Sequence, residues 1–360
     1  MNNLQFTREE EFRAVNAVRE LYASLIEKSA GSIGPLHGKT MFPKTVPLTN
    51  NIHASSPILY VAAKNRIEQI TPSFSSANST VSTLRVPPHR YLGLHSFRIE
   101  GVPYLAAGYS SGIIIVNTQD QAERQHLVFD RNNTSKFNSI GHTGKTLEDT
   151  ILWGVHSDFG VLRLPLPDLL SNNINSHDYL ISLGTSPSNV QPLRICVSQD
   201  RVFASTGSTV YQYNPSHQKF DFYSDLAANT ISAICVQDTT PYAGTTSGKI
   251  YRDGTLWYNV GNPTSAIGKI IALPDQSILF TTLTRNLSGP LQWTDGQKAI
   301  VVSSPLSQVH DMVQSSNHIF TVENRIIRSA MIESKSIAEW NWAAQEYDSI
   351  KNGISITVEE

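Results

Sequence analysis

The 360-residue chain is long enough for one large all-β ring or for two or three ordinary domains, and its hydrophobic content of 40% is enough to build a core. Charged residues make up only 16% and the formal net charge is −2, which argues against coiled coils, long helices and disorder of the bulk chain. Because no long basic run is present, nucleic acid is a poor candidate partner.

The cysteines and the N-terminal residues bear on the compartment. Cys196 and Cys235 give neither a disulfide framework nor the spacing of metal ligands. Residues 8–11 are charged and the N-terminal residues lack the apolar core of a signal peptide. No apolar run approaches the roughly 20 residues that cross a bilayer. We therefore expect a cytoplasmic protein without a membrane segment.

Residues 7–28 carry the only strong helical pattern of the chain. Thr7 and Glu10 form a capping box, and one face of the helix then collects Phe12, Val15, Tyr22, Leu25 and Ile26. Two interpretations stay open: the helix packs on the outside of its own ring, or it is a docking helix for a partner. Glycines follow it, so residues 1–44 are expected to be an N-terminal amphipathic helix and a linker.

From about residue 45 to residue 360, short apolar strands alternate with turn residues in a repeating pattern. Residues 232–251 show the unit, which is three strands joined by tight turns. We align four positions as equivalents in the first strands of successive units, namely Ile195, Ile234, Ile271 and Asp311. They lie 39, 37 and 40 residues apart by subtraction of their numbers. Four-stranded propeller blades repeat every 40–45 residues or so.

The two ends of the repeating region complement each other. Residues 352–359 have the pattern of a first strand with no second strand after it, whereas the first unit begins at Pro57 with the pattern of a second strand. The simplest arrangement lets the last strand complete the first blade. We therefore predict an all-β fold for residues 45–360, a propeller of about seven blades closed by the C-terminal strand.

Two turn phrases carry a resemblance to a known superfamily. Residues 107–113 and 243–250 resemble the bend between the second and third blade strands of WD40-like and quinoprotein-like β-propellers. The resemblance covers roughly residues 45–360 and stops at architecture, because the Gly-His and Trp-Asp signature of WD40 repeats is missing. It implies a β-propeller, and propellers with an N-terminal helix occur as scaffold subunits of multiprotein assemblies.

Motifs that could carry chemistry have plain structural interpretations beside them. Gly144, Lys145 and Thr146 end like a phosphate-binding loop, but Ser139 stands where its first glycine is required and no helical pattern follows. This favours a hairpin turn.

Several histidines could converge on a central channel and hold a metal, with Asp158 or Asp311 assisting. The candidates are His95, His156 and His310. Their spacing carries no ligand signature, which favours structural roles. We assign no catalytic, cofactor or metal residue, and Cys196 and Cys235 are expected to be small apolar core residues.

Trp340 and Trp342 share parity on one expected strand, so they face the same side. They could form an exposed contact patch, or the surface that the N-terminal helix covers. We expect a non-catalytic interaction scaffold or regulatory subunit that binds other proteins through propeller loops and the N-terminal helix. The alternative is a propeller enzyme or carbohydrate-binding protein that uses the central channel. Candidate partner-binding residues are Phe12, Tyr22, Leu25, Trp340 and Trp342.

Overall fold

Four-stranded antiparallel sheets account for almost all of the described structure. Within the described residues there are seven of these sheets. The predicted helix of residues 7–28, with Phe12, Tyr22 and Leu25, and the expected boundary after residue 44 lie outside those residues and stay predictions. The computed structural model describes residues 57–72, 79–128, 137–156, 160–171, 180–181, 194–198, 200–227, 229–262, 265–284, 287–302, 308–315, 318–323, 325–332, 340, 342–350 and 353–359.

We call the seven sheets blades 1 to 7 and give their strands from the innermost outward. Blade 1 consists of β28 (Gly353–Glu359), β1 (Ile58–Ala63), β2 (Arg66–Thr71) and β3 (Thr80–Thr83), and blade 2 of β4 (Tyr91–Ile99), β5 (Val102–Tyr109), β6 (Gly112–Asn117) and β7 (Ala122–Val128). Blade 3 consists of β8 (Phe137–Thr143), β9 (Ile151–His156), β10 (Gly160–Pro165) and β11 (Leu180–Ile181), and blade 4 of β12 (Arg194–Ser198), β13 (Arg201–Thr206), β14 (Thr209–Asn214) and β15 (Lys219–Asp225).

Blade 5 consists of β16 (Ile231–Gln237), β17 (Thr240–Thr245), β18 (Lys249–Arg252) and β19 (Thr255–Asn259). Blade 6 consists of β20 (Ala266–Ala272), β21 (Ile278–Thr284), β22 (Leu287–Thr294) and β23 (Ala299–Val301). Blade 7 consists of β24 (Val309–Ser315), β25 (His318–Glu323), β26 (Ile326–Met331) and β27 (Trp342–Glu346). A short helix, α2 (Leu166–Leu170), follows β10, and a 3₁₀ turn, η3 (Asp348–Ile350), precedes β28. Neither helix in the described part of the chain has the length and apolar character needed to cross a bilayer.

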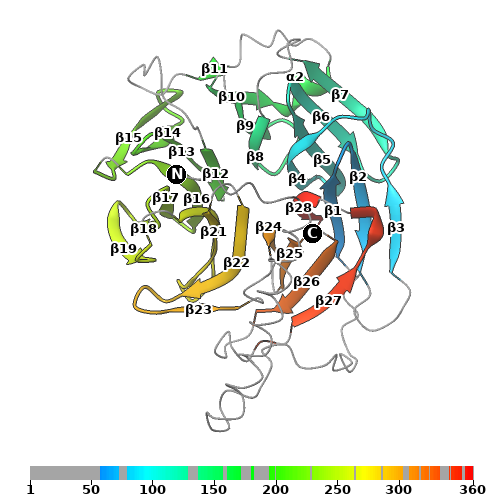
Figure 1. Ribbon diagram of the computed structural model, residues 1–360. Helices are drawn as coiled ribbons and strands as arrows, with labels where there is room; N and C mark the ends of the chain where they lie inside the picture. The colour runs from blue at the N-terminus through cyan, green and yellow to red at the C-terminus, as the bar shows by residue number, and fades with distance from the viewer. Residues whose placement is uncertain are drawn as a thin grey trace, which may run out of the picture. The chain divides into compact units, whose positions relative to one another are not determined.

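The first strands of the blades surround a common centre, as Figure 1 shows. Going round the ring, β28 contacts β4, and the contacts continue through β8, β12, β16, β20 and β24 back to β28. The closing sheet pairs the last strand with the first, with Tyr60 opposite Thr357 and Ala62 opposite Ser355. The structure is therefore a seven-bladed β-propeller, and the predicted closure by the C-terminal strand is confirmed.

The core lies between neighbouring blades, and one repeated apolar position builds much of it. On each inner strand a residue at this position packs against the preceding blade, because alternate side chains of a strand point to opposite faces. Burying an aliphatic side chain of this kind contributes roughly 1.5–3 kcal/mol. The residues that fill the position in six of the blades are Leu94, Ile140, Ile195, Ile234, Ile270 and Ile356.

The register corrects two members of the aligned repeat position. Ile195 and Ile234 stand opposite Ala204 and Ala243 as equivalents. In blade 6 the equivalent residue is Ile270, opposite Phe280, and in blade 7 it is Met312, opposite Thr321. The alignment was one residue late at Ile271 and one residue early at Asp311. Such a slip exchanges the two faces of a strand, and adjacent isoleucines at 270 and 271 hide it from a pattern of apolar residues.

All inner strands run in the same direction, so the propeller has two distinct ends. The closing end holds Glu359 and the loops that join first to second and third to fourth strands, including the turn at Glu100 and Gly101. The crossing end holds the loops that join second to third strands, including Lys64 and Asn65, and the segments that cross from one blade to the next.

Candidate functional site

Polar groups on the inner strands connect every pair of neighbouring blades. Each of the seven junctions has a hydrogen bond or ion pair between two first strands. In ring order from blades 1 and 2 onward, the contacts are Ser96 N–H to Thr357 Oγ1 (3.1 Å), His95 Nε2 with His142 Nδ1 (2.8 Å), Ser139 Oγ to Ile195 O (2.8 Å), Arg194 Nε to Ser232 O (3.2 Å), Ser232 Oγ to Ile267 O (2.7 Å), Lys269 Nζ with Asp311 Oδ1 (2.9 Å) and Ser355 Oγ to Asp311 Oδ2 (3.0 Å).

One repeat position supplies most of these contacts. It directly precedes the apolar position described above and faces the following blade. Where it holds alanine or glycine, a near neighbour on the strand makes the contact instead: Ser232 in blade 5 and His95 in blade 2. In order from blade 2 round to blade 1, the position is filled by Gly93, Ser139, Arg194, Ala233, Lys269, Asp311 and Ser355.

Asp311 has the most contacts of these residues. It is 6% exposed. Its carboxylate pairs with Lys269 and accepts hydrogen bonds from the Ser355 hydroxyl, from the Ile356 N–H at 3.2 Å and from the Met312 N–H at 3.0 Å. A buried carboxylate needs such partners because it has lost its water. These contacts hold blades 6, 7 and 1 together.

His95 and His142 form a neutral pair between blades 2 and 3. Burial, and then the neighbouring His142 ring, lowers the pKa of His95 to about 3, and burial also lowers the pKa of His142. At neutral pH one ring nitrogen therefore donates and the other accepts. The His95 ring also stacks on Phe97, with the ring centroids 5.8 Å apart.

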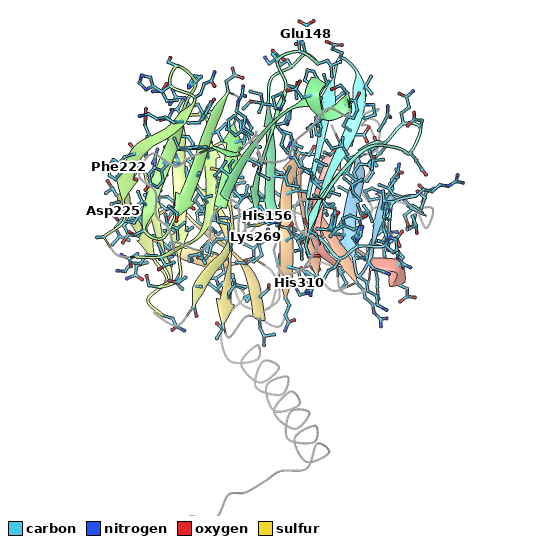
Figure 2. All side chains as sticks on the ribbon, turned by 90° about the horizontal axis from the view of Figure 1, so that it is seen from above. Glu148, His156, Phe222, Asp225, Lys269 and His310 are labelled. Carbon is cyan, nitrogen blue, oxygen red and sulfur yellow. The ribbon has the colours of Figure 1, made fainter. Side chains whose placement is uncertain are left out.

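The other two histidines considered as metal ligands occupy different surroundings. His156 is fully buried at the end of β9, opposite Phe137. His310 lies at a register shift in β24, where burial lowers its pKa against the opposing effect of Glu323 and Asp311. Figure 2 shows both, with Lys269, among the strands, whereas Glu148 projects at one end. Among the described residues, no three His, Cys, Asp or Glu side chains are grouped to hold a metal. Asp158 lies outside them.

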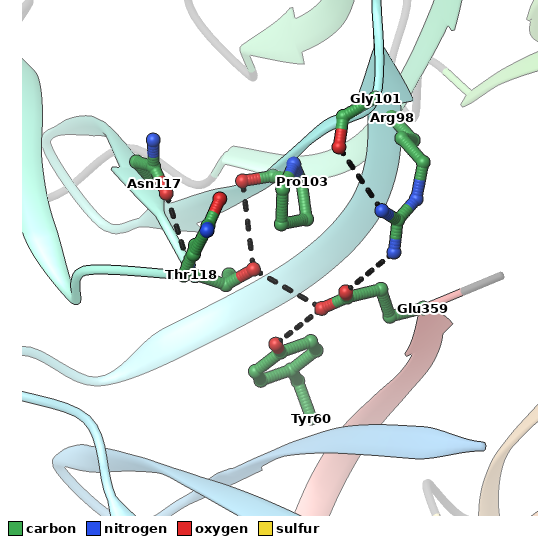
Figure 3. A network of polar contacts seen from close by, with 8 residues as sticks. Tyr60, Arg98, Gly101, Pro103, Asn117, Thr118 and Glu359 are labelled. Carbon is green, nitrogen blue, oxygen red and sulfur yellow. Dashed lines mark hydrogen bonds and ion pairs between the residues drawn. The ribbon is translucent and has the colours of Figure 1, made fainter. Parts of the chain in front are cut away.

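A second polar network fastens the closing strand, and Figure 3 shows it. Glu359, at the end of β28, has a side chain only 9% exposed. Its carboxylate accepts hydrogen bonds from the Tyr60 hydroxyl at 2.6 Å and the Thr118 hydroxyl at 3.1 Å, and it pairs with Arg98 at 2.9 Å. Burial and the Glu359 carboxylate raise the pKa of the Tyr60 hydroxyl. The Glu359 side chain thus joins the closing strand to Tyr60 in its own sheet and to Arg98 and Thr118 in blade 2.

The segment that resembles the end of a phosphate-binding loop is a tight turn. The Asp149 carboxylate accepts the backbone N–H groups of Lys145 and Thr146 at 2.9 and 2.7 Å. Gly144 has φ +94°, and a Cβ there would lie 2.5 Å from the Asp149 carbonyl oxygen, so glycine is required. The chain's own carboxylate occupies the position that a phosphate would need.

The tryptophans proposed as partner contacts lie next to each other and are largely buried. Trp340 is 4% exposed and Trp342, at the start of β27, is 9% exposed, with their ring centroids 6.4 Å apart. They do not form an exposed patch in this structure. A partner would have to displace neighbouring groups to reach them, and their role in binding stays a prediction.

Cys196 and Cys235 occupy the same repeat position, opposite Phe203 and Tyr242 respectively. They pack into different blade junctions, Cys196 between blades 4 and 5 and Cys235 between blades 5 and 6. Both are free thiols. Burial raises the pKa of Cys196 and raises that of Cys235 to about 12, so both are thiols rather than reactive thiolates at neutral pH.

Comparison with known proteins places the fold but no family. No known family model matches the chain, and no curated protein matches it in sequence. The fold is similar to that of the computationally designed Ika8 protein, with TM-score 0.55 and 12% identity over 83% of this chain and 87% of that one. It is also similar to a chain of the mitotic checkpoint complex, with TM-score 0.53 and 11% identity over 88% and 96%. At such identities the likeness concerns architecture alone.

The sequence did not reveal the contacts that hold the ring together. No sequence pattern singles out His142, Lys269 or Glu359. The sequence does carry one signal for these contacts. In most inner strands a polar residue directly precedes the repeated apolar position.

Proposed function

We propose that this protein is a non-catalytic interaction scaffold, or a regulatory subunit, of a multiprotein assembly. The observation that carries the proposal is the use of the inner polar groups. His95, Lys269 and Asp311, which could serve an enzyme's chemistry, are engaged in contacts between neighbouring blades. A group committed to holding the ring is poorly placed to bind or transform a substrate, because substrate would have to displace its structural partner.

The loops at the two ends are the surfaces left for recognition. A rigid scaffold that presents loops is the usual arrangement of a binding module, because the loops can vary without loss of the core. The predicted N-terminal helix, with Phe12, Tyr22 and Leu25, would add a second contact outside the described residues. The fold also occurs in a chain of the mitotic checkpoint complex, which is compatible with this role. A cytoplasmic location belongs to the proposal.

Affinity purification of the full chain from its native cell tests the proposal. The bait is compared with a variant in which Phe12→Glu and Leu25→Glu break the predicted apolar face, and with Arg13→Glu as a control on the other face. We expect partners that co-purify in fixed ratio and are partly lost with the double variant.

The competing interpretation is tested on the same material. Metal analysis and a glycan array would detect a channel that binds a metal or a sugar. A chain that purifies without any protein partner, and that carries a metal or binds a glycan, would contradict the scaffold proposal.

A further inference from the structure

Folding assembles a basic surface at the crossing end of blades 1 and 2 that no basic run in the sequence marks. Lys64 lies in the turn between β1 and β2, and Arg66 begins β2. Arg85 and Arg90 lie in the segment that crosses from blade 1 to blade 2. We call these four residues the basic patch.

Backbone pairing brings the two segments together. The Leu84 N–H donates to the Ile67 carbonyl at 2.9 Å, directly beyond the last paired step of β2 and β3. Arg85 and Arg66 are the next residues along these two strands. The register of blade 1 therefore places Lys64, Arg66 and Arg85 together, and Arg90 follows five residues later in the same crossing segment.

Three charges of the patch are not neutralised by described residues. Lys64, Arg85 and Arg90 are exposed, and their side chains make no hydrogen bond or ion pair within the described part of the chain. Arg66 differs, since its guanidinium pairs with the buried Glu68 at 2.5 Å and donates to the Ser349 carbonyl at 2.9 Å. The described acidic groups at the crossing end of the adjoining blade 7 are Glu323, Glu346 and Asp348, of which Glu323 is paired with Arg328 and Asp348 with Arg325.

The crossing segment between Arg85 and Arg90 is held in one conformation. The His89 ring stacks on Tyr109 with centroids 4.1 Å apart and planes 7° apart. The Pro87 carbonyl accepts hydrogen bonds from the His89 N–H at 2.9 Å and the Tyr91 hydroxyl at 2.5 Å. A partner would meet charges whose backbone is already ordered, which lowers the entropic cost of binding.

An exposed sheet edge lies beside these charges. β3 is the outermost strand of blade 1, and all four of its residues are exposed and uncharged. Val81, in its middle, is 40% exposed. Edge strands without protective charges can pair with an additional strand, and this is a recurring way to bind extended peptides.

We propose that the basic patch and the edge of β3 bind an extended acidic segment of a partner protein. The segment would pair with β3 while its carboxylates meet Lys64, Arg85 and Arg90. This inference deepens the scaffold proposal and rests on it. A phosphate backbone fits less well, because three cations would displace few counterions and the chain has a net charge of −2.

Fluorescence anisotropy of the full chain tests this inference with a labelled peptide of alternating glutamate and valine. The variant Lys64→Gln, Arg85→Gln, Arg90→Gln is compared with a control of equal charge change at the closing end, Lys145→Gln, Arg201→Gln, Lys298→Gln. We expect the first variant to bind at least about fivefold more weakly and the control to change less than about twofold. Affinity should also fall as salt is added.

Two results would overturn the inference: equal peptide affinity in the two variants, or tighter binding of a single-stranded oligonucleotide of matched charge. A thermal unfolding curve for each variant confirms that it is folded. Unchanged peptide binding by the first variant removes this surface alone, because the scaffold proposal is judged separately, by co-purification of protein partners.

Discussion

Glu359 offers the sharpest test of how the ring is closed. Replacing it by glutamine keeps the size and one carbonyl acceptor but removes the charge that Tyr60 and Thr118 donate to. Hydrogen bonds to a charged group contribute about 1.5–3 kcal/mol each, and the ion pair with Arg98 adds about 0–1 kcal/mol because Arg98 is 46% exposed. Since glutamine still accepts one hydrogen bond, we expect Glu359→Gln to cost about 1–3 kcal/mol of closing-strand stability.

The assay is hydrogen exchange of the backbone amides of β28, which reports local opening of that strand. A loss of this size corresponds to roughly 5-fold to 150-fold faster exchange. Glu148→Gln is the matched control, because Glu148 is exposed in a loop at the closing end and undergoes the same change of charge. Exchange of β28 at the wild-type rate in Glu359→Gln would refute the reasoning, as would equal acceleration by the control.

Three further predictions concern the inner strands. Burial and His142 lower the pKa of His95 to about 3, so as pH falls below about 6.5 this histidine is protonated in the unfolded chain but not in the folded one. The free energy of unfolding should therefore drop by up to about 1.4 kcal/mol per pH unit. Between pH 7 and pH 5, urea unfolding should show a smaller drop in His95→Gln than in the wild-type chain, and equal drops would contradict this. Asp311→Asn should lower the free energy of unfolding in urea by about 2–4 kcal/mol. Lys269→Gln should lower it by less than about 1 kcal/mol, because the Lys269 side chain is 46% exposed. The reverse order would contradict the central place of Asp311 in these contacts. Because their raised pKa keeps Cys196 and Cys235 as thiols, both should react with a thiol reagent at pH 8 more slowly in the native chain than after unfolding; equal rates in the two states would contradict this.

The propeller architecture could be predicted because the same sequence pattern recurs along the chain. Each blade repeats the same alternation of apolar strands and turn residues, and the strand at residues 352–359 lacked a partner that only the first blade could supply. Local patterns of this kind report which residues are buried, and burial decides how the strands pair.

The contacts that fasten the ring could not be predicted, for a physical reason. His95 and His142 are 47 residues apart and occupy successive positions of the repeat, not the same one. Whether they meet depends on how far two blades are rotated against each other, which no local pattern records. Glu359 likewise reaches Thr118 and Arg98 only because closure of the ring brings the first and second blades beside it.

The one-residue slip at Ile271 and Asp311 shows the limit of apolar patterns. The irregular pairing between Ile267 and Ile270 shifts the faces of β20, and an isoleucine stands on both. Placed correctly, the position before Ile270 is Lys269 and the position before Met312 is Asp311, and the ion pair between blades 6 and 7 becomes apparent.

Cross-linking mass spectrometry of the assembly purified from the native cell tests the central claim most directly. If the inner polar groups hold the ring and the ends bind partners, a lysine-reactive reagent should join partner proteins to end lysines such as Lys64 and Lys298 and not to Lys269. Partner cross-links concentrated on Lys269, or a bound small molecule that Lys269→Gln releases, would contradict the account.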